Sequence, residues 1–367
     1  MSSETKLRVG LVGCGKIADA HVEEIGKMAN AELVGVCDKE LLMAEQVAVR
    51  YQIASYYDDL GKLLAEKAPD VIHVTTPPQS HLALATQAID GGCHVYVEKP
   101  FAVNADEARR LIEHAERAER RLTVGYIYQF DPATLALRGL IAQGRLGDVV
   151  HVESHFGYDL DGPFGAAILG NAGHWVHELP GGLFQNNLDH ALAKTLEFVT
   201  DPRPAVRAFG YRLRTKTFGD IRDQLGDELR VILIGKKTSA YVTFCSHAKP
   251  ITHFLRLYGT KNVVTVNYVT RTLTVDRAPK FPSAIGRLLP PFAQGWDFLG
   301  QGGRNIIRFA RSDFHFFAGM NRLLRLFYDS IGGEGPLPIS YRDIMRVSET
   351  SDEIFEQIKQ TLGAEAK

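Results

Sequence analysis

The sequence lacks several signals that assign a protein to a specialised class. Only four cysteines occur among its 367 residues, and none shows a C-x-x-C or histidine-paired spacing. Isolated cysteines among apolar neighbours are typical of reduced core residues, so we expect a metal-free protein. The first residues show no charged and then apolar leader, and no segment approaches the ~20 apolar residues that span a bilayer. These absences predict a cytoplasmic protein.

An excess of charge, internal repeats and low-complexity tracts are missing as well. Lys and Arg number 42 against 43 Asp and Glu, which gives a formal net charge of -1. Because no global field recruits nucleic acid, we expect no DNA or RNA partner. The chain exceeds the size at which one hydrophobic core usually stops growing, and 45% of its residues are hydrophobic. Two folded domains are therefore expected.

A glycine-rich turn lies near the start of the chain. The apolar run 9–12 leads into Gly13, Gly15 and Ala18, and a helical pattern follows. Gly13 permits the turn, Gly15 lets backbone approach a pyrophosphate, and Ala18 allows helix and strand to pack closely. The next apolar run ends in Asp38, twenty residues after Ala18, where a carboxylate would meet a ribose hydroxyl. The pattern predicts a dinucleotide site.

Strand and helix patterns alternate as far as Phe130 and then give way to period-two alternation. The first pattern predicts an α/β domain with a doubly wound parallel sheet of Rossmann type. The later runs, joined by tight connections, predict an open antiparallel sheet in a second, α+β domain. These runs cover residues 149–158, 205–214, 228–234, 239–246, 254–258, 262–267 and 270–275.

We accordingly expect a dinucleotide-binding Rossmann domain over residues 1–130. A substrate-binding and oligomerisation domain is expected over 131–340, and a C-terminal helix over 341–367 that packs back near the Rossmann domain. Within the second domain, residues 182–199 read as a helix, whereas the Pro- and Gly-rich stretch 279–303 reads as irregular.

Two stretches lie where a bound dinucleotide would present its nicotinamide. Lys99 follows a strand of the parallel sheet, on the side where ligands bind, and its cation would favour a developing alkoxide. A surface lysine at a strand end fits that position equally well. In the expected helix, Asn186 and His190 are four residues apart and share one face. A histidine there can exchange the proton of an alcohol, although these residues alone favour a hydrogen-bonded core histidine.

The ordered set of motifs resembles the Gfo/Idh/MocA family of nicotinamide-dependent oxidoreductases, and the resemblance covers nearly the whole chain. The motifs that carry it are Gly13–Ala18, Thr75–His81, Glu98–Pro100, Gly125–Phe130 and Gly181–His190. The resemblance implies that Lys99 and His190 are catalytic and that the Lys99–Pro100 peptide is cis. Because the family often has aspartate four residues before the histidine and this chain has Asn186, we assign the base role to His190 alone. Lys99 is its electrostatic partner, and Tyr128 is a second candidate.

The resemblance also carries over the cofactor contacts. The cofactor contacts are Gly13, Gly15, Lys16, Ile17, Asp38, Thr75, Pro77, His81, Glu98 and Lys99. Asp38 repels a 2′-phosphate and so argues for NAD over NADP, although the neighbouring Lys39 tempers that preference. The candidate substrate contacts are Lys99, Tyr128, Trp175, Asn186, Asn187 and His190. For Trp175 and Asn187 a purely structural role fits equally well.

The leading hypothesis is an NAD-dependent sugar or cyclitol dehydrogenase of EC 1.1.1 type that acts on a secondary hydroxyl. Two alternatives are a redox-neutral epimerase or glycoside-cleaving enzyme with bound NAD, and a non-catalytic dinucleotide-bound sensor. We expect a homodimer or homotetramer, as in the family.

The stretch 287–325 is basic and amphipathic. Packing on the sheet or a subunit interface is its favoured interpretation. Contact with an anionic membrane surface, or with a lipid-linked or nucleotide-linked sugar, is the alternative.

Overall fold

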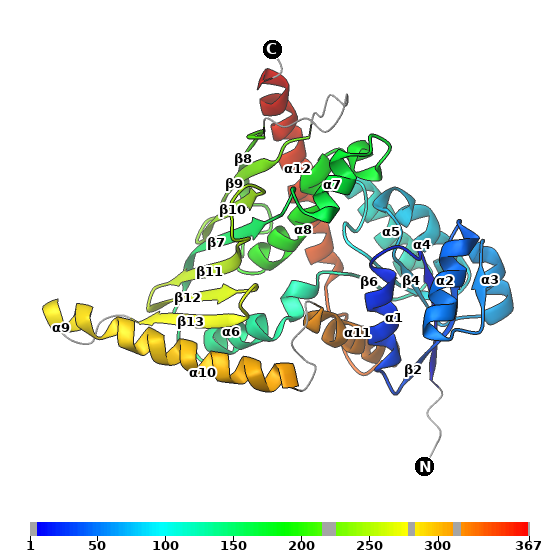
Figure 1. The fold of residues 1–367 in the computed structure, drawn as a ribbon, viewed down its shortest axis with the longest axis horizontal. Coiled ribbons are helices and arrows are strands. Elements are labelled where there is room, and N and C mark those ends of the chain that lie inside the picture. Colours follow the sequence, from blue (N-terminus) through cyan, green and yellow to red (C-terminus); the bar gives the residue numbers. More distant parts are fainter. Residues whose placement is uncertain (1–5, 215–224, 278–282, 311–316, 366–367) are drawn as a thin grey trace. The chain divides into compact units, whose positions relative to one another are not determined.

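The computed structural model describes residues 6–214, 225–277, 283–310 and 317–365. They form two compact units, one of residues up to Ile127 with Gly319–Glu349, the other of Tyr128–Ala318 with the residues from Thr350 onward. Figure 1 labels the elements of both. The domain boundaries expected from the sequence stay predictions.

The first unit is built on a six-stranded parallel sheet in the order β3-β2-β1-β4-β5-β6. The strands are β1 (Leu7–Val12), β2 (Ala31–Cys37), β3 (Tyr56–Tyr57), β4 (Val71–Val74), β5 (His94–Val97) and β6 (Leu122–Val124). Between β1 and β4 the strand order reverses direction, and ligands bind beyond the carboxyl ends of the strands at such a switch point. The Rossmann-type parallel sheet is confirmed.

Helices alternate with these strands because apolar residues recur on one face of each. They are α1 (Ala18–Gly26), α2 (Leu41–Tyr51), α3 (Leu60–Lys67), η1 (Pro78–Ser80), α4 (His81–Asp90), α5 (Ala105–Arg117) and α11 (Ala318–Ile331), with the first part of α12 (Tyr341–Glu365). Leu11 of β1, Val22 of α1 and Val47 of α2 meet in one buried cluster, which fixes the start of α1 against the end of β1.

The second unit is built on a seven-stranded sheet in the order β13-β12-β11-β7-β10-β9-β8. Its strands are β7 (Val149–Gly157), β8 (Ala205–Tyr211), β9 (Glu228–Ile234), β10 (Ser239–Cys245), β11 (His253–Gly259), β12 (Asn262–Asn267) and β13 (Thr272–Arg277). Its helices are η2 (Ile127–Phe130), α6 (Pro132–Ala142), α7 (Pro163–Leu169), η3 (Trp175–Glu178), α8 (Gly182–Leu196), α9 (Ser283–Leu288) and α10 (Pro290–Ala310), with the last part of α12.

The sheet is mixed, so the prediction of a purely antiparallel sheet is wrong at one pair. β10 runs parallel to β7, with Ala240 opposite Val152, whereas the other neighbours are antiparallel. After β7 the chain crosses through α7 and α8 and then forms the β8, β9 and β10 meander, which brings β10 back along β7. Period-two alternation reports the two faces of a strand but not its direction, so the sequence could not reveal this pair.

The expected irregular structure over 279–303 is also wrong for the described residues. α9 begins at Ser283 and α10 begins at Pro290, where a first-turn proline costs no backbone hydrogen bond. Residues 279–282 lie outside the described part of the chain. Glycines lower helix propensity, but the contacts of α10 with β13 hold it in place.

Side chains from helices cap both edge strands of this sheet. Gln357 of α12 accepts from Ala208 N at 2.9 Å and donates to Val206 O at 3.2 Å on β8. At the other edge, Gln301 of α10 makes the same paired contact with the amide and carbonyl of Leu273 on β13. The backbone groups of the two edges are therefore partly occupied.

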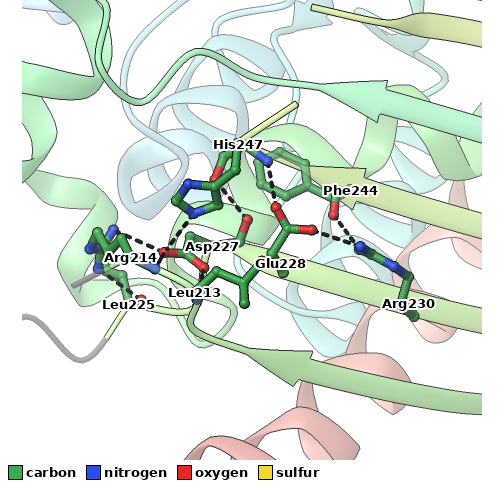
Figure 2. A network of polar contacts seen from close by, with 9 residues as sticks. Leu213, Arg214, Leu225, Asp227, Glu228, Arg230, Phe244 and His247 are labelled. Carbon is green, nitrogen blue, oxygen red and sulfur yellow. Dashed lines mark hydrogen bonds and ion pairs between the residues drawn. The ribbon is translucent and has the colours of Figure 1, made fainter. Parts of the chain in front are cut away.

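The start of β9 carries two fully buried carboxylates (Figure 2). Asp227 accepts from the backbone N–H of Leu213 at 2.8 Å and lies 3.2 Å from His247 Nε2. Glu228 accepts from Arg230 Nη2 at 2.8 Å and from Ser246 N at 3.0 Å. These partners offset the cost of removing charge from water, so we interpret the network as structural.

The turn into α8 predicts a selective effect of glycine substitution. A Cβ on Gly181 would lie 2.4 Å from the Phe355 ring, whereas one on Gly139 in α6 would meet nothing within 4 Å. Gly181→Ala should lower the unfolding free energy by about 1–3 kcal/mol, because the added methyl group overpacks the core, and so lower the thermal midpoint. Gly139→Ala should leave it unchanged or raise it. Equal midpoints of the two variants in a thermal melt would contradict this packing.

Candidate functional site

The first candidate site is the turn between β1 and α1. Gly13 has a φ of +103°, and a Cβ there would lie 2.7 Å from backbone atoms of Thr75 and Thr76. Its N–H donates to Cys37 O at 2.8 Å, which ties the turn to β2. Only glycine fits this backbone, because it adopts positive φ without steric cost.

The rest of the turn is open. A Cβ on Gly15 would meet nothing within 4 Å, and Lys16 is exposed. Ile17 is the N-cap of α1 and offers no side-chain acceptor to the first helical N–H groups. An uncapped helix N-terminus beside exposed backbone is the arrangement that receives a pyrophosphate.

Asp38 lies directly after β2 and reaches back to the turn. Its Oδ2 accepts from Cys14 N at 2.7 Å, and its Oδ1 accepts from Glu40 N at 3.0 Å. Each carboxylate oxygen has two lone pairs, so the half-buried Asp38 can still accept from a ribose hydroxyl. The position matches the one expected from the sequence.

The residues after β4 lie at the same carboxyl edge of the parallel sheet. Thr75 Oγ1 lies 2.6 Å from Gly13 O and binds the turn, while Pro77 is exposed. His81 is fully buried, and its Nε2 lies 2.8 Å from Thr76 O. Burial lowers the pKa of His81, so it donates as a neutral ring to carbonyl oxygen. This arrangement orients the loop, and a direct contact of His81 with cofactor stays a prediction.

Glu98 and Lys99 follow β5 at the same edge. Glu98 is buried, its Oε2 accepts from Lys99 N at 3.0 Å, and its Oε1 lies 3.0 Å from His21 Nε2. Lys99 is half-buried, and the Lys99–Pro100 peptide is cis, as the resemblance implies. Glu98 therefore fixes the backbone on which Lys99 is carried.

A buried hydrogen-bonded chain continues from Glu98. His21 Nδ1 lies 2.8 Å from His73 Nδ1, and His73 Nε2 lies 2.8 Å from the Tyr328 hydroxyl. Burial and the neighbouring His21 hold the pKa of His73 well below its usual value, and burial raises the pKa of Tyr328. His73 thus stays neutral. His21 contacts both His73 and Glu98 and so helps to orient the Glu98 carboxylate.

The second candidate site is centred on α8 in the other unit. His190 is almost fully buried, 5.0 Å from the Tyr128 ring in an edge arrangement and stacked 5.6 Å from Phe156. The helix that was expected to carry it is confirmed over Gly182–Leu196, and Asn186 lies one turn before His190. A histidine held between two rings has a fixed orientation, which a proton-transfer group requires.

The sequence analysis missed a buried lysine in this cluster. Lys194 is fully buried, and its Nζ lies 2.5 Å from His253 Nε2 and 4.6 Å from the centroid of the Tyr268 ring. Burial holds the pKa of Lys194 well below its usual value. Burial and the neighbouring Lys194 hold the pKa of His253 well below its usual value as well. Two cations cannot share this site, and both shifts favour the neutral forms. The only signal in the sequence was the spacing of four residues from His190.

The other predicted substrate contacts lie in different surroundings within the second unit. Asn187 Nδ2 donates to Leu183 O at 3.1 Å and so returns to its own helix. Trp175 lies in η3, half-buried and stacked 5.4 Å from His174. Asn186 and Tyr128 are buried, and burial raises the pKa of the Tyr128 hydroxyl, which therefore stays protonated near neutral pH. Their contacts with a substrate stay predictions.

Neither site offers a clear metal centre. Among the described residues, no group of three or more His, Cys, Asp or Glu is placed to hold a metal ion. In the same part of the chain, no helix has the length and apolar character needed to cross a membrane.

Comparison with known sequences identifies relatives of the first unit. Residues 7–126 match the sequence model of a family described as "Oxidoreductase family, NAD-binding Rossmann fold". The D-glucoside 3-dehydrogenase of Escherichia coli (strain K12) is 33% identical over 148 residues, which cover 40% of this chain and 42% of that protein. An inositol 2-dehydrogenase of Salmonella typhimurium (strain LT2) is 29% identical over 150 residues, 40% of this chain and 45% of that protein. The matched region thus spans less than half the length of these relatives.

Solved structures share the fold over nearly the whole chain. The WlbA dehydrogenase from Bordetella pertussis, crystallised with NADH and UDP-GlcNAcA, gives a TM-score of 0.75 at 20% identity and covers 98% of this chain and 97% of that one. The UDP-N-acetylglucosamine 3-dehydrogenase GnnA from Acidithiobacillus ferrooxidans gives 0.72 at 19% identity, with 97% and 99% covered. At this identity the likeness establishes the fold alone.

The two glycines of the turn predict different defects. Gly15→Ala should fold normally, because its Cβ meets open space, yet weaken NADH binding by crowding the pyrophosphate. Gly13→Ala should lower the thermal midpoint as well, because its Cβ meets backbone and its φ is positive. NADH fluorescence titration and thermal melts separate the effects. Unimpaired NADH binding by Gly15→Ala would contradict the site.

Lys194 predicts a pH-dependent stability difference. Since its pKa is lowered on folding, the unfolded chain binds a proton that the folded chain does not, and stability rises with pH up to its ordinary value of 10.5. The unfolding free energy of Lys194→Met relative to wild type should therefore fall as the pH is raised from 7 to 10. The change is at most about 1.4 kcal/mol per pH unit.

Lys236→Met, at an exposed position, is the matched control and should show no such trend. Urea unfolding at several pH values measures the difference. Absence of the trend in Lys194→Met would show that Lys194 is charged in the folded state.

Proposed function

Because residues 7–126 belong to the Gfo/Idh/MocA oxidoreductases with an NAD-binding Rossmann fold, we propose that this chain is an NAD-dependent dehydrogenase. Its substrate would be a sugar, sugar derivative or cyclitol with a secondary hydroxyl. The observation that carries the proposal is the edge of the parallel sheet, where the Gly13–Ala18 turn, Asp38 and Lys99 follow β1, β2 and β5. Relatives named as glucoside and inositol dehydrogenases support the substrate class.

The cofactor contacts follow from this edge. The open turn at Gly15 and the N-terminus of α1 receive the pyrophosphate, and Asp38 accepts from the adenosine ribose. A 2′-phosphate would meet the Asp38 carboxylate, so NAD is preferred over NADP. When bound, NAD supplies the hydride acceptor.

His190 acts as the acid/base of the proposed reaction. It takes the hydroxyl proton as the alcohol is oxidised and returns it in reduction. Lys99, as a cation, stabilises the alkoxide that develops while hydride leaves. Asn186, on the same face of α8 as His190, can orient the hydroxyl but cannot take its proton.

Association between copies of the chain would use the sheet face that α8 does not cover. On that face, exposed apolar side chains lie on three neighbouring strands, with Ile232 opposite Tyr241. Phe209 of β8 is 58% exposed beside them. An exposed apolar surface on a wide sheet supports a homodimer or homotetramer.

Substitution of the two proposed catalytic residues tests the function. His190→Ala should lower turnover by about 10²–10⁴-fold, since it removes the proton acceptor, and leave NADH binding intact. Lys99→Ala should lower turnover because the alkoxide loses its cation. Reduced-nicotinamide absorbance measures turnover on sugars and cyclitols, and fluorescence titration measures NADH binding.

The control is His114→Ala, at a histidine on α5 that pairs with Asp90 away from both sites. It should retain wild-type turnover. Unchanged turnover in His190→Ala would overturn the assignment. Product without net change in absorbance would indicate a redox-neutral epimerase or glycoside-cleaving enzyme, and neither signal with any substrate would indicate a dinucleotide-bound sensor.

A further inference from the structure

Helix α10 exposes its apolar face and turns its polar face toward the protein. It runs along the edge strand β13 (Figure 1), yet it has no buried residue. Its polar side chains Gln294, Asp297 and Gln301 contact β13: Gln294 binds Asp276, Asp297 pairs with Arg277, and Gln301 binds Leu273. The helix is therefore held by hydrogen bonds and ion pairs rather than by apolar packing.

The opposite face of α10 is a continuous apolar surface. Large side chains recur there at helical spacing, and Trp296 and Phe309 are both 74% exposed. The exposed apolar residues of the helix are Phe292, Trp296, Phe298, Leu299, Ile306, Ile307 and Phe309. A surface of this size on a soluble protein marks a contact with another apolar phase or molecule.

A basic cavity opens along one flank of this helix. It has a volume of about 350 Å³ and lies between α6, β13 and α10. Trp296 lines it and also belongs to the apolar face, so the cavity adjoins that face. Five of its lining residues are arginines, namely Arg145, Arg271, Arg277, Arg304 and Arg308.

Carboxylates neutralise only part of this charge. Arg271 lies 3.9 Å from Asp131, and Arg277 lies 3.2 Å from Asp297. Within the ranges that the structure describes, no carboxylate pairs with Arg145, Arg304 or Arg308. Guanidinium groups that converge on one cavity repel one another, and a phosphate group relieves that repulsion through paired hydrogen bonds.

We propose that α10 lies in the surface of an anionic lipid bilayer, with its apolar face among the acyl chains and a lipid phosphate in the arginine cavity. A helix with aromatic and aliphatic residues on one face and basic residues beside them has the pattern of such interfacial helices. Arg304 lies next to the apolar face, whereas Arg308 lies on the face of Gln301, and both line the cavity that a headgroup phosphate would enter. Asp297, the single acidic residue of α10, already pairs with Arg277.

A second copy of the chain is the competing occupant, and the charge distribution disfavours it. Pairing of α10 with its own copy would cover the apolar face but supply no acid to the cavity arginines, because Asp297 is the only acidic residue of α10 and already pairs with Arg277. An anionic surface matches both the apolar face and the arginine-lined cavity beside it.

Vesicle flotation of the full-length protein tests the proposal. Wild type should float with vesicles of phosphatidylcholine and phosphatidylglycerol, stay behind with phosphatidylcholine alone, and release at high salt. Arg304→Gln/Arg308→Gln should lower the partition coefficient about fivefold for each charge removed. Trp296→Ser/Ile307→Ser should abolish flotation, because it removes the apolar anchor. Trp296, Ile307 and Arg304 are exposed and Arg308 is half-buried, so no variant removes a buried side chain and each should keep the wild-type thermal midpoint.

Matched controls separate this surface from general charge and apolarity. Arg110→Gln/Arg117→Gln removes two exposed charges on α5, and Leu42→Ser/Val49→Ser removes two exposed apolar residues of α2. Both should float like wild type. The readout does not depend on catalysis, so it succeeds or fails independently of the proposed dehydrogenase activity.

Three results would overturn the proposal. The first is wild-type protein that stays in the soluble fraction with anionic vesicles. The second is absence of flotation together with a dimer that Trp296→Ser/Ile307→Ser dissociates in native mass spectrometry, which would assign the face to a second copy. The third is saturable binding of glycerol phosphate by calorimetry, lost in Arg304→Gln/Arg308→Gln, without flotation, which would assign the cavity to a soluble phosphate.

Discussion

The cost of removing polar groups from water governs the second unit, because its central helix α8 is buried along its whole length. A helix of this kind usually carries apolar residues, yet α8 contains Asn186, Asp189, His190 and Lys194 in buried positions. Each such group must find a partner or lose its charge. The neutral pair of Lys194 and His253 and the ring contacts of His190 are the outcome. α8 therefore keeps polar side chains inside the protein, where the proposed function assigns His190 its role.

Much of the first unit could be predicted from the sequence because its signals are local. Gly13, Gly15 and Ala18 specify a turn within six residues, and the apolar runs around it specify buried parallel strands. Asp38 could be placed by counting along the same strand-helix-strand unit. Backbone atoms of Thr75 leave no room for a Cβ at position 13, so glycine is required there. The sequence does not show this contact, but the motif implies a turn that needs glycine.

The predictions from the sequence were wrong or incomplete where contacts between residues far apart in the chain decide the structure. Nothing near β7 or β10 records that they run parallel, because the crossover through α8 sets that direction. Pro290, Gly300 and Gly302 made α10 read as irregular, whereas contacts with β13 stabilise a helix there. Nothing in the sequence marks Lys194 as buried, because burial of α8 depends on tertiary packing and its partner His253 lies 59 positions away in the chain.

The paired glutamine contacts at the two ends of the large sheet limit how copies of this chain can associate. Gln357 occupies backbone groups of β8, and Gln301 occupies those of β13. A strand from another chain would compete with these glutamines for the same backbone groups. This competition disfavours growth of the sheet by strand addition, even though β7, β8, β9 and β10 expose apolar side chains. The apolar face of the sheet can thus stay exposed while its two edges are partly protected.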